Sequence, residues 1–480
     1  MSERDRLVVW VAILASFVAF LDGSIVNVAL PAVRDDLGGG LAIQQWVLDA
    51  YLLALGALIL TAGAISDTYG RVRVLRWGLL GFGAASLACA LAPSGALLIG
   101  ARGLQGVAAA LLVPSSLALI TSTFDGPARG TAIGTWTAWT STAFVVGPLI
   151  GGILVDTAGW RWVFGINVLP LAVTLALMAR LDDPVRTEPS SRIDFPGATL
   201  AAAGLGGSVF AFIEQARLGW THPMVLVPLL LGVACLAGFL LWESRARHPM
   251  MPLRLFRDRT FSAGNLATAA IYSGLSLGLL VVVLYLQEVA GFSATSAGLA
   301  TVPVAVFPLV LGRYFGSMAG AKGPRTLMTL GPLVAGGGFL LMLTAAEPFN
   351  FWLQMLPGLM TFGIGVAMTV APLTAAVLGS VPPELSGVGS AINNAVSRVA
   401  GLIAIAFAGT VIGPTLVLES FHRAMVVSAS LLFIGAVVSA VGVSNLEPAA
   451  YAPEAVAACH DRIVPAGSQA AAPHPAEQDH

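Results

Sequence analysis

Long apolar stretches, most of them without a charged residue, recur along the whole 480-residue chain. A helix needs about twenty predominantly apolar residues to cross a bilayer, and by that criterion about fourteen spans can be placed. They cover residues 8–30, 42–65, 74–92, 96–121, 130–154, 161–180, 195–214, 223–242, 261–286, 296–318, 327–346, 352–378, 386–411 and 424–445. The sequence therefore predicts an all-α integral membrane protein.

The composition agrees with many membrane spans and excludes an ordinary soluble domain. Hydrophobic residues make up 57% of the chain and charged residues 10%, whereas soluble domains carry about 25% charged residues. The net charge of −1 gives no indication of a nucleic-acid partner. The three cysteines, Cys89, Cys235 and Cys459, lie too far apart for a zinc site or a disulfide framework. We expect no metal and no cofactor.

Basic residues between the spans fall mostly on one side of the membrane. With the N-terminus inside, about sixteen Lys and Arg residues lie in inward loops and about four in outward loops, as cytoplasmic loops require. The first apolar run is too long for the core of a signal peptide, so it is predicted to be retained as a span. Both termini are predicted to be cytoplasmic. The Ala/Pro/His-rich tail, residues 447–480, is predicted to be disordered.

A short motif occurs twice at equivalent places. The first copy, Gly63-x3-Asp67-x2-Gly70-Arg71, joins the second and third spans. The second copy, Gly316-x3-Gly320-x2-Gly323-x-Arg325, joins the tenth and eleventh spans. Two parallel six-span halves would leave this pattern, with two additional spans near 195–242 inserted between them.

The stretch Gly134–Leu154 carries small residues that a simple anchor does not need. Ala143, Gly147 and Gly151 repeat every four residues and form a stripe that lets another helix approach closely. Pro148 removes a backbone hydrogen bond and can bend the helix. An ordinary packing face is the simpler interpretation of such a stripe. The alternative is a contact that seals the two halves of the chain against each other at Gly147 and Gly151, with Gly152 on a different face.

Two charged residues lie well inside apolar helices. The carboxylate of Asp22 costs at least ~2.5–3.5 kcal/mol at the centre of a membrane helix, so it must pair, face water or take up a proton. Arg102 is a permanent cation and cannot shuttle protons itself, but it can control the protonation of a nearby carboxylate. Purely structural roles, a capped carboxylate and a buried counter-ion, are the alternatives.

Five stretches together resemble the fourteen-span drug:proton antiporter branch of the major facilitator superfamily. They are Leu21-Asp22-Gly-Ser-Ile-Val-Asn27-Val-Ala-Leu-Pro31, the Gly63–Arg71 loop, Leu98-x3-Arg102-x2-Gln105-Gly106, Gly147-Pro148-x2-Gly151-Gly152, and Gly387–Arg398. The resemblance extends over roughly residues 8–445. It implies two six-helix bundles plus two additional central helices, and export of lipophilic small molecules in exchange for protons.

The resemblance also implies roles for individual residues. Asp22 and Arg102 correspond to proton-coupling positions. The inner loop corresponds to a latch that holds one orientation, formed here by Gly63, Asp67, Gly70, Arg71 and Arg73. Thr68 stands where the family usually has Arg, and Gly320 replaces the aspartate in the second copy, so we expect an asymmetric latch. Gly147, Pro148, Gly151 and Gly152 correspond to the antiporter helix motif.

The candidates for the substrate cavity combine carboxylates, an amide and aromatic rings. They are Asp22, Asn27, Asp49, Trp136 and Trp139. Asp49 is the second choice for a carboxylate that faces a cationic substrate, although acids near span ends more often face headgroups or water. The tryptophans can stack on a flat substrate, but packing against lipid is the more common role.

We therefore predict a multi-pass transporter of the bacterial cell membrane, driven by the proton motive force. Its parts are an N-terminal half (1–182), a linker with two additional spans (183–259), a C-terminal half (260–446) and the tail (447–480). The partners are protons, lipid and a lipophilic substrate whose identity and charge the sequence does not specify; nor does it specify stoichiometry or oligomeric state. A proton-coupled uptake symporter of the same fold is the main alternative. No nucleotide-binding loop or catalytic constellation indicates an enzyme.

Overall fold

The computed structural model describes residues 3–124, 126–181, 194–246, 249–382, 385–413 and 415–445, without the side chains of Asp67, Gly126 and Pro127. All regular structure in these residues is helical. The N-terminal half contains α1 (Glu3–Ile25), η1 (Val26–Ala29), α2 (Leu30–Leu37), α3 (Gly40–Tyr69), α4 (Arg71–Ala90), α5 (Gly95–Thr123), α6 (Gly126–Ser141), α7 (Ala143–Thr157), α8 (Trp162–Gly165) and α9 (Val168–Met178).

The remaining helices form an inserted pair and a C-terminal half. The inserted pair is α10 (Phe195–Leu218) and α11 (Pro223–Arg245). After η2 (Leu253–Arg257) come α12 (Arg259–Glu288), α13 (Ala294–Lys322), α14 (Arg325–Leu341), η3 (Met342–Thr344), η4 (Phe351–Met355), α15 (Leu356–Gly379), α16 (Ser386–Ala406), α17 (Ala408–Ile412) and α18 (Leu418–Gly442).

The helices match the predicted spans in number and place. Thirteen helical segments of the described residues are long and apolar enough to cross a membrane. The sixth predicted span corresponds to the shorter apolar segment Trp162–Met178. Some spans are continuous helices, such as α10, and others are broken, such as the first one at the 3-10 turn η1. The fold class predicted from the sequence is confirmed.

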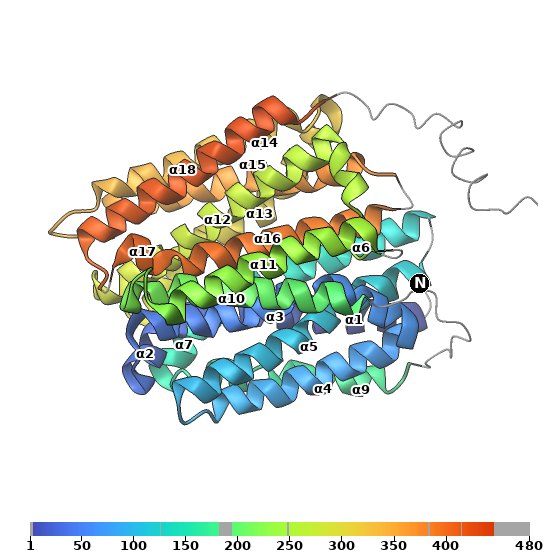
Figure 1. Cartoon of the computed structure of the whole chain (residues 1–480), viewed down its shortest axis with the longest axis horizontal. Helices are drawn as coiled ribbons and strands as arrows, with labels where there is room; N and C mark the ends of the chain where they lie inside the picture. Colours follow the sequence, from blue (N-terminus) through green and yellow to red (C-terminus); the bar gives the residue numbers. More distant parts are fainter. Residues whose placement is uncertain are drawn as a thin grey trace, which may run out of the picture. The chain divides into compact units, whose positions relative to one another are not determined.

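Helices pack first within their own half. In the N-terminal half α5 packs on α1, α3 and α4, and in the C-terminal half α12 and α14 pack on α18, and α13 and α14 on α15. The most extensive contacts between the halves are those of α7 with α13 and of α3 with α16. Figure 1 shows the blue N-terminal and the yellow to red C-terminal helices as two groups that run in similar directions.

The inserted pair α10–α11 lies along the junction of the halves. Helix α10 packs on its partner α11, on α3 of one half and on α16 of the other. In Figure 1 the green helices α10 and α11 run beside α3 and α16. Small residues allow this approach, because a Cβ on Gly207 would lie 2.5 Å from the Pro228 carbonyl oxygen. The insertion thus contacts both halves.

The repeated motif marks equivalent breaks between helices. Gly70 ends α3 with φ 94° and Gly323 ends α13 with φ 83°, and a new helix begins within two residues of each. A positive φ is readily adopted only by glycine, which explains its presence in both copies. The repeat detected in the sequence therefore corresponds to a structural equivalence between the halves.

The chain divides into two units, Met1–Ser444 and Asn445–His480. The predicted boundaries between the halves and the insertion lie within the first unit and stay a prediction. The described residues do not include residues 182–193, which connect α9 to α10, or the tail from residue 446. The predicted disorder of the tail is therefore not tested.

Candidate functional site

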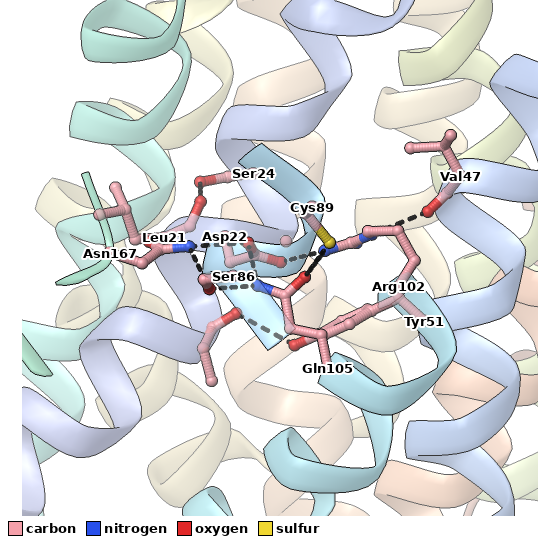
Figure 2. A network of polar contacts seen from close by, with 12 residues as sticks. Leu21, Asp22, Ser24, Val47, Tyr51, Ser86, Cys89, Arg102, Gln105 and Asn167 are labelled. Atoms are coloured by element: carbon pink, nitrogen blue, oxygen red, sulfur yellow. Dashed lines mark hydrogen bonds and ion pairs between the residues drawn. The ribbon is translucent and has the colours of Figure 1, made fainter. Parts of the chain in front are cut away.

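Asp22 and Arg102 form an ion pair in the interior of the N-terminal half. The Nη1 atom of Arg102 lies 2.5 Å from Oδ2 of Asp22, and both residues are 0% exposed. Asp22 lies near the end of α1 and Arg102 in the first third of α5. Figure 2 shows the pair among other polar side chains of this half, including those of Ser86, Gln105 and Asn167. The structure thus brings together the two charges predicted to couple protons.

The second oxygen of the Asp22 carboxylate also has its partners. Oδ1 accepts hydrogen bonds from Nε2 of Gln105 at 2.8 Å and from Nδ2 of Asn167 at 2.9 Å. The Ser86 hydroxyl accepts from the same two amides, at 2.8 and 3.3 Å. Gln105 in turn accepts from Arg102 Nη1 at 2.6 Å. Both carboxylate oxygens are satisfied, which lowers the cost of burying the charge.

Helix geometry explains why these side chains meet. Arg102 and Gln105 are three residues apart and lie on one face of α5. At Gly106 this helix touches α3, because a Cβ there would lie 2.3 Å from the Tyr51 carbonyl oxygen. The close approach lets Arg102 Nε donate to the Val47 carbonyl at 2.9 Å and places its guanidinium 4.3 Å from the centroid of the Tyr51 ring. A larger residue at Gly106 would separate the helices and lengthen both contacts.

Asp49 is a second buried acid, and it is isolated. Its side chain on α3 is 0% exposed, and no hydrogen-bond donor of the described residues reaches either carboxylate oxygen. One helical turn away, Gln45 donates to the carbonyls of Ile405 and Ala406 at 2.7 and 2.9 Å, so this face of α3 meets the C-terminal half. The prediction that Asp49 lines a substrate cavity is not tested, and in this conformation its side chain is enclosed by protein.

The other cavity candidates take different positions. Trp136 is half-buried and its indole Nε1 donates to the Ser16 hydroxyl at 3.1 Å. Trp139 is exposed and its ring centroid lies 5.5 Å from that of Trp10. Asn27, in the 3-10 turn η1, donates to the Gly23 and Ser24 carbonyls at 3.3 and 3.4 Å. Their roles in substrate binding stay predictions.

The predicted latch lies at the α3–α4 break. Gly70 caps α3 with its positive φ, and Arg71 Nη1 donates to the Ala118 carbonyl on α5 at 3.0 Å. Gly63 lies in α3, and a Cβ added there would have no other atom within 4 Å. Arg73 is exposed in the first turn of α4. The side chain of Asp67 lies outside the described residues, so its predicted pairing stays a prediction.

Gly147 and Gly151 contact α1 of their own half. A Cβ on Gly147 would lie 3.0 Å from Ser24 Cβ, and one on Gly151 would lie 2.6 Å from Ile25 Cγ1. The Ser24 hydroxyl donates to the Ala143 carbonyl at 3.0 Å, which ties α1 to the start of α7. The small-residue stripe is therefore a close helix contact, as predicted, but it lies within one half.

The contact with the other half belongs to Gly152 and Pro148. A Cβ on Gly152 would lie 2.5 Å from the Ala294 carbonyl oxygen, and one on Gly298 would lie 2.2 Å from the Pro148 carbonyl oxygen. The expectation that Gly147 and Gly151 join the halves while Gly152 faces elsewhere is therefore wrong. The reason is rotational: Gly152 is about 100° further around the helix than Gly151, and that face is turned toward α13.

Polar contacts reinforce this junction, which we call the seal (Pro148, Gly152 and Asp156 of α7 with Ala294, Thr295 and Gly298 of α13). The Asp156 carboxylate accepts from the Ala294 and Thr295 amides at 3.1 and 2.8 Å, so it caps the first turn of α13. Glu288, which shortly precedes Ala294 in the sequence, forms an ion pair with Arg34. Nη1 of Arg34 lies 2.6 Å from Oε1 of Glu288, and the pair joins α2 to α12.

Sequence reasoning missed several members of the Asp22 network. Asn167, Ser86 and Tyr51 were not singled out, although an amide in the predicted span 161–180 was a usable signal. Asp156 was not singled out either, because it lies at the end of a span, where an acid more often faces headgroups or water. No group of three or more His, Cys, Asp or Glu residues in the described part of the chain is arranged to hold a metal ion.

Comparison with known proteins identifies the family to which this architecture belongs. Residues 12–405 match the model of the Major Facilitator Superfamily. The chain is 36% identical over 412 residues to puromycin resistance protein pur8 of Streptomyces alboniger, covering 84% of this chain and 80% of that protein. It is 34% identical over 415 residues to multidrug resistance protein Stp of Mycobacterium tuberculosis, covering 85% and 76%.

Solved structures agree on the fold at low sequence identity. A D-xylose–proton symporter superposes with a TM-score of 0.66 at 15% identity, covering 92% of this chain and 99% of that chain. A POT family peptide transporter gives 0.67 at 17% identity, covering 90% and 96%. With the family model, the relatives and the helical arrangement in agreement, this chain is a multi-pass membrane transporter that belongs to the Major Facilitator Superfamily.

Proposed function

We propose that this transporter exports hydrophobic small molecules, such as antibiotics, across a bacterial cell membrane in exchange for protons. Similar proteins carry names that refer to resistance or export, among them methylenomycin A resistance protein of Streptomyces coelicolor and tetracenomycin C resistance and export protein of Streptomyces glaucescens. These names support export of a drug-like molecule. They leave the substrate of this chain open.

The buried Asp22–Arg102 pair is the observation that carries the proton-coupling part of the proposal. Asp22 is a titratable group enclosed in a transporter, with its charge balanced by a cation at 2.5 Å. If helix movement separates the two side chains, the isolated carboxylate takes a proton, because an unpaired charge is costly at that depth. When the pair re-forms, Arg102 favours the ionised carboxylate and the proton leaves. An exchanger needs this alternation.

Alternating access requires two arrangements of the halves, and the seal is the part that would open. In the predicted topology the seal lies at the outer end, so the structure corresponds to a state closed to the outside. Its main elements are backbone contacts at Gly152 and Gly298 and the capping carboxylate of Asp156. These are short-range interactions that either form or are lost, as rocking between two states requires.

The driving force is adequate for efflux. One proton moving inward is worth roughly 2.3 kcal/mol per 100 mV of membrane potential. At about 1.4 kcal/mol for each tenfold, this supports a gradient of a neutral solute on the order of fifty-fold.

A transport assay in inverted membrane vesicles tests the proposal. The vesicles are energised and offered matched cationic, neutral and anionic dyes. We expect accumulation of at least one lipophilic dye inside the vesicles, abolished by a protonophore. Accumulation that persists without a proton gradient excludes proton coupling. Loss of preloaded dye on energisation, instead of accumulation, indicates the symporter alternative.

A further inference from the structure

A pair of carboxylates joins the two inserted helices at one end. Asp194 is the N-cap of α10, where its Oδ1 accepts from the Gly197 amide at 2.9 Å and from the Trp242 indole at 2.9 Å. Glu243, in the last turn of α11, is 3% exposed, and its Oε2 accepts from the Met251 amide at 3.0 Å. One oxygen of each carboxylate therefore already accepts at least one hydrogen bond.

The remaining oxygen of each carboxylate lies beside Gly197 and is without a hydrogen-bond donor among the described residues. Oδ2 of Asp194 and Oε1 of Glu243 are both buried and make no hydrogen bond within the described residues. They lie against the same point of α10, because a Cβ on Gly197 would be 2.6 Å from Asp194 Oδ2 and 3.0 Å from Glu243 Oε1. Two buried acceptors in this arrangement repel each other if both groups are ionised.

We propose that Asp194 and Glu243 bind one proton between them, as a carboxyl–carboxylate pair that clamps the inserted helices together. The proton supplies the donor that both orphaned oxygens lack, and it removes one of two negative charges at a site where the described residues supply no cation. The inference does not depend on the direction or the coupling of transport.

The charged groups around the pair do not replace the proton. The elements that carry the pair or lie near it, α3, α10, α11 and η2, bear these other charged side chains: Asp49, Asp67, Glu214, Arg217, Arg245, Arg254 and Arg257. Apart from Asp67, whose side chain lies outside the described residues, none forms an ion pair with Asp194 or Glu243. Arg192, Arg247 and His248 also lie outside the described residues.

The clamp holds the connecting segment, residues 249–258, that leads from α11 into the C-terminal half. Glu243 fixes it at the Met251 amide. The next residue back, Met250, accepts a weak hydrogen bond at Sδ from the Thr61 hydroxyl of α3 at 3.7 Å. Further on, Leu255 is buried in a cluster with Phe261 and Val377 of the C-terminal half. The protonated pair therefore anchors a segment that touches both halves.

Infrared spectroscopy of the purified full-length protein tests for the proton directly. At neutral pH the wild type minus Glu243→Gln difference spectrum should contain the carbonyl stretch of a protonated carboxyl. Asp194→Asn should give the same loss and serves if the first variant folds poorly. Glu419→Gln, which removes an exposed acid in the first turn of α18, should leave the band in place. Absence of the band from both differences overturns the proposal.

Thermal unfolding across a pH series gives a second readout. The folded pair holds a proton that separate carboxyls of the unfolded chain release at neutral pH, so wild-type stability should fall as the pH rises and the proton leaves. In Glu243→Gln the amide can donate to Asp194 permanently, so that component of the pH dependence should be lost, whereas Glu419→Gln should retain it. A wild-type Tm that a metal chelator lowers would assign the two oxygens to a metal cation and overturn the shared proton.

Discussion

Asp22 and Arg102 are separated by 80 positions in the sequence, yet their side chains meet at 2.5 Å inside one half of the transporter. The side chains that bind the Asp22 carboxylate, those of Arg102, Gln105 and Asn167, all belong to that same half. The pair therefore does not hold the two halves together. Whether the ion pair is formed or broken can instead respond to small movements of α1 against α5 as the halves rock.

The first prediction concerns the stability that this pair gives to the N-terminal half. Arg102→Gln leaves the Asp22 charge buried with only neutral partners, and breaking a buried pair in this way typically costs about 3–5 kcal/mol. Thermal unfolding of the detergent-solubilised protein should show a clear drop in Tm. The double variant Asp22→Asn/Arg102→Gln should recover part of the loss, because no unpaired charge remains. An unchanged Tm for Arg102→Gln alone contradicts the buried ion pair.

The second prediction separates the two faces of α7. Leucine at Gly152 pushes against Ala294 of the other half, and overpacking of this kind typically costs ~1–3 kcal/mol, comparable with the few kcal/mol between two conformations. In an Ala294→Cys background, Gly152→Leu should increase labelling by a membrane-impermeant thiol reagent. Gly151→Leu disturbs the contact with α1 instead and should lower Tm without increased labelling.

Gly100→Leu is the matched control for both variants. It lies on α5, where a Cβ added to the glycine would have no other atom within 4 Å, so the same added bulk meets open space. It should change neither the labelling nor the Tm. If Gly151→Leu increases labelling as strongly as Gly152→Leu, the assignment of the seal to Gly152 is wrong.

The helices could be predicted from the sequence because the bilayer restricts both length and polarity. The expected span 195–214 corresponds to α10, Phe195–Leu218, since a single long apolar run satisfies its own backbone hydrogen bonds in lipid only as a helix. That Asp22 and Arg102 need partners could be predicted for the same reason, because a charge at that depth is costly when it is unpaired, whereas their role in proton coupling stays a prediction. These inferences need only the chain and the solvent.

The partners of those charges could not be predicted in the same way. Ser86 is neutral, and hydroxyls are common in membrane helices, so nothing in the sequence distinguishes it from a packing residue. The amide of Asn167 indicates a buried polar contact, but the sequence does not say which side chain it meets. The sequence likewise does not predict which face of α7 is turned toward the other half. Gly151 and Gly152 are neighbours in the sequence, and only the packing of α1 and α13 around the helix decides which of them meets the other half.

The third prediction concerns membrane topology. Reporters fused after Arg4 and after Glu447 should both signal a cytoplasmic location, because basic residues concentrate on that side. Fusions within residues 183–192 and 245–259 should agree, since the pair α10–α11 restores the parity of the crossings. A signal from outside for the C-terminal fusion would mean an odd number of spans and would exclude the fourteen-span arrangement.

The central claim, that Asp22 couples substrate export to protons, is tested most directly with Asp22→Asn in proteoliposomes. The substitution keeps the size of the side chain and removes its titration, so the proton gradient has nothing to act on. We predict that the variant still exchanges substrate across the membrane without a gradient but no longer concentrates it when a pH gradient is imposed. Concentration at the wild-type rate would contradict the account and would transfer the coupling role to another carboxylate, with Asp49 the first to examine.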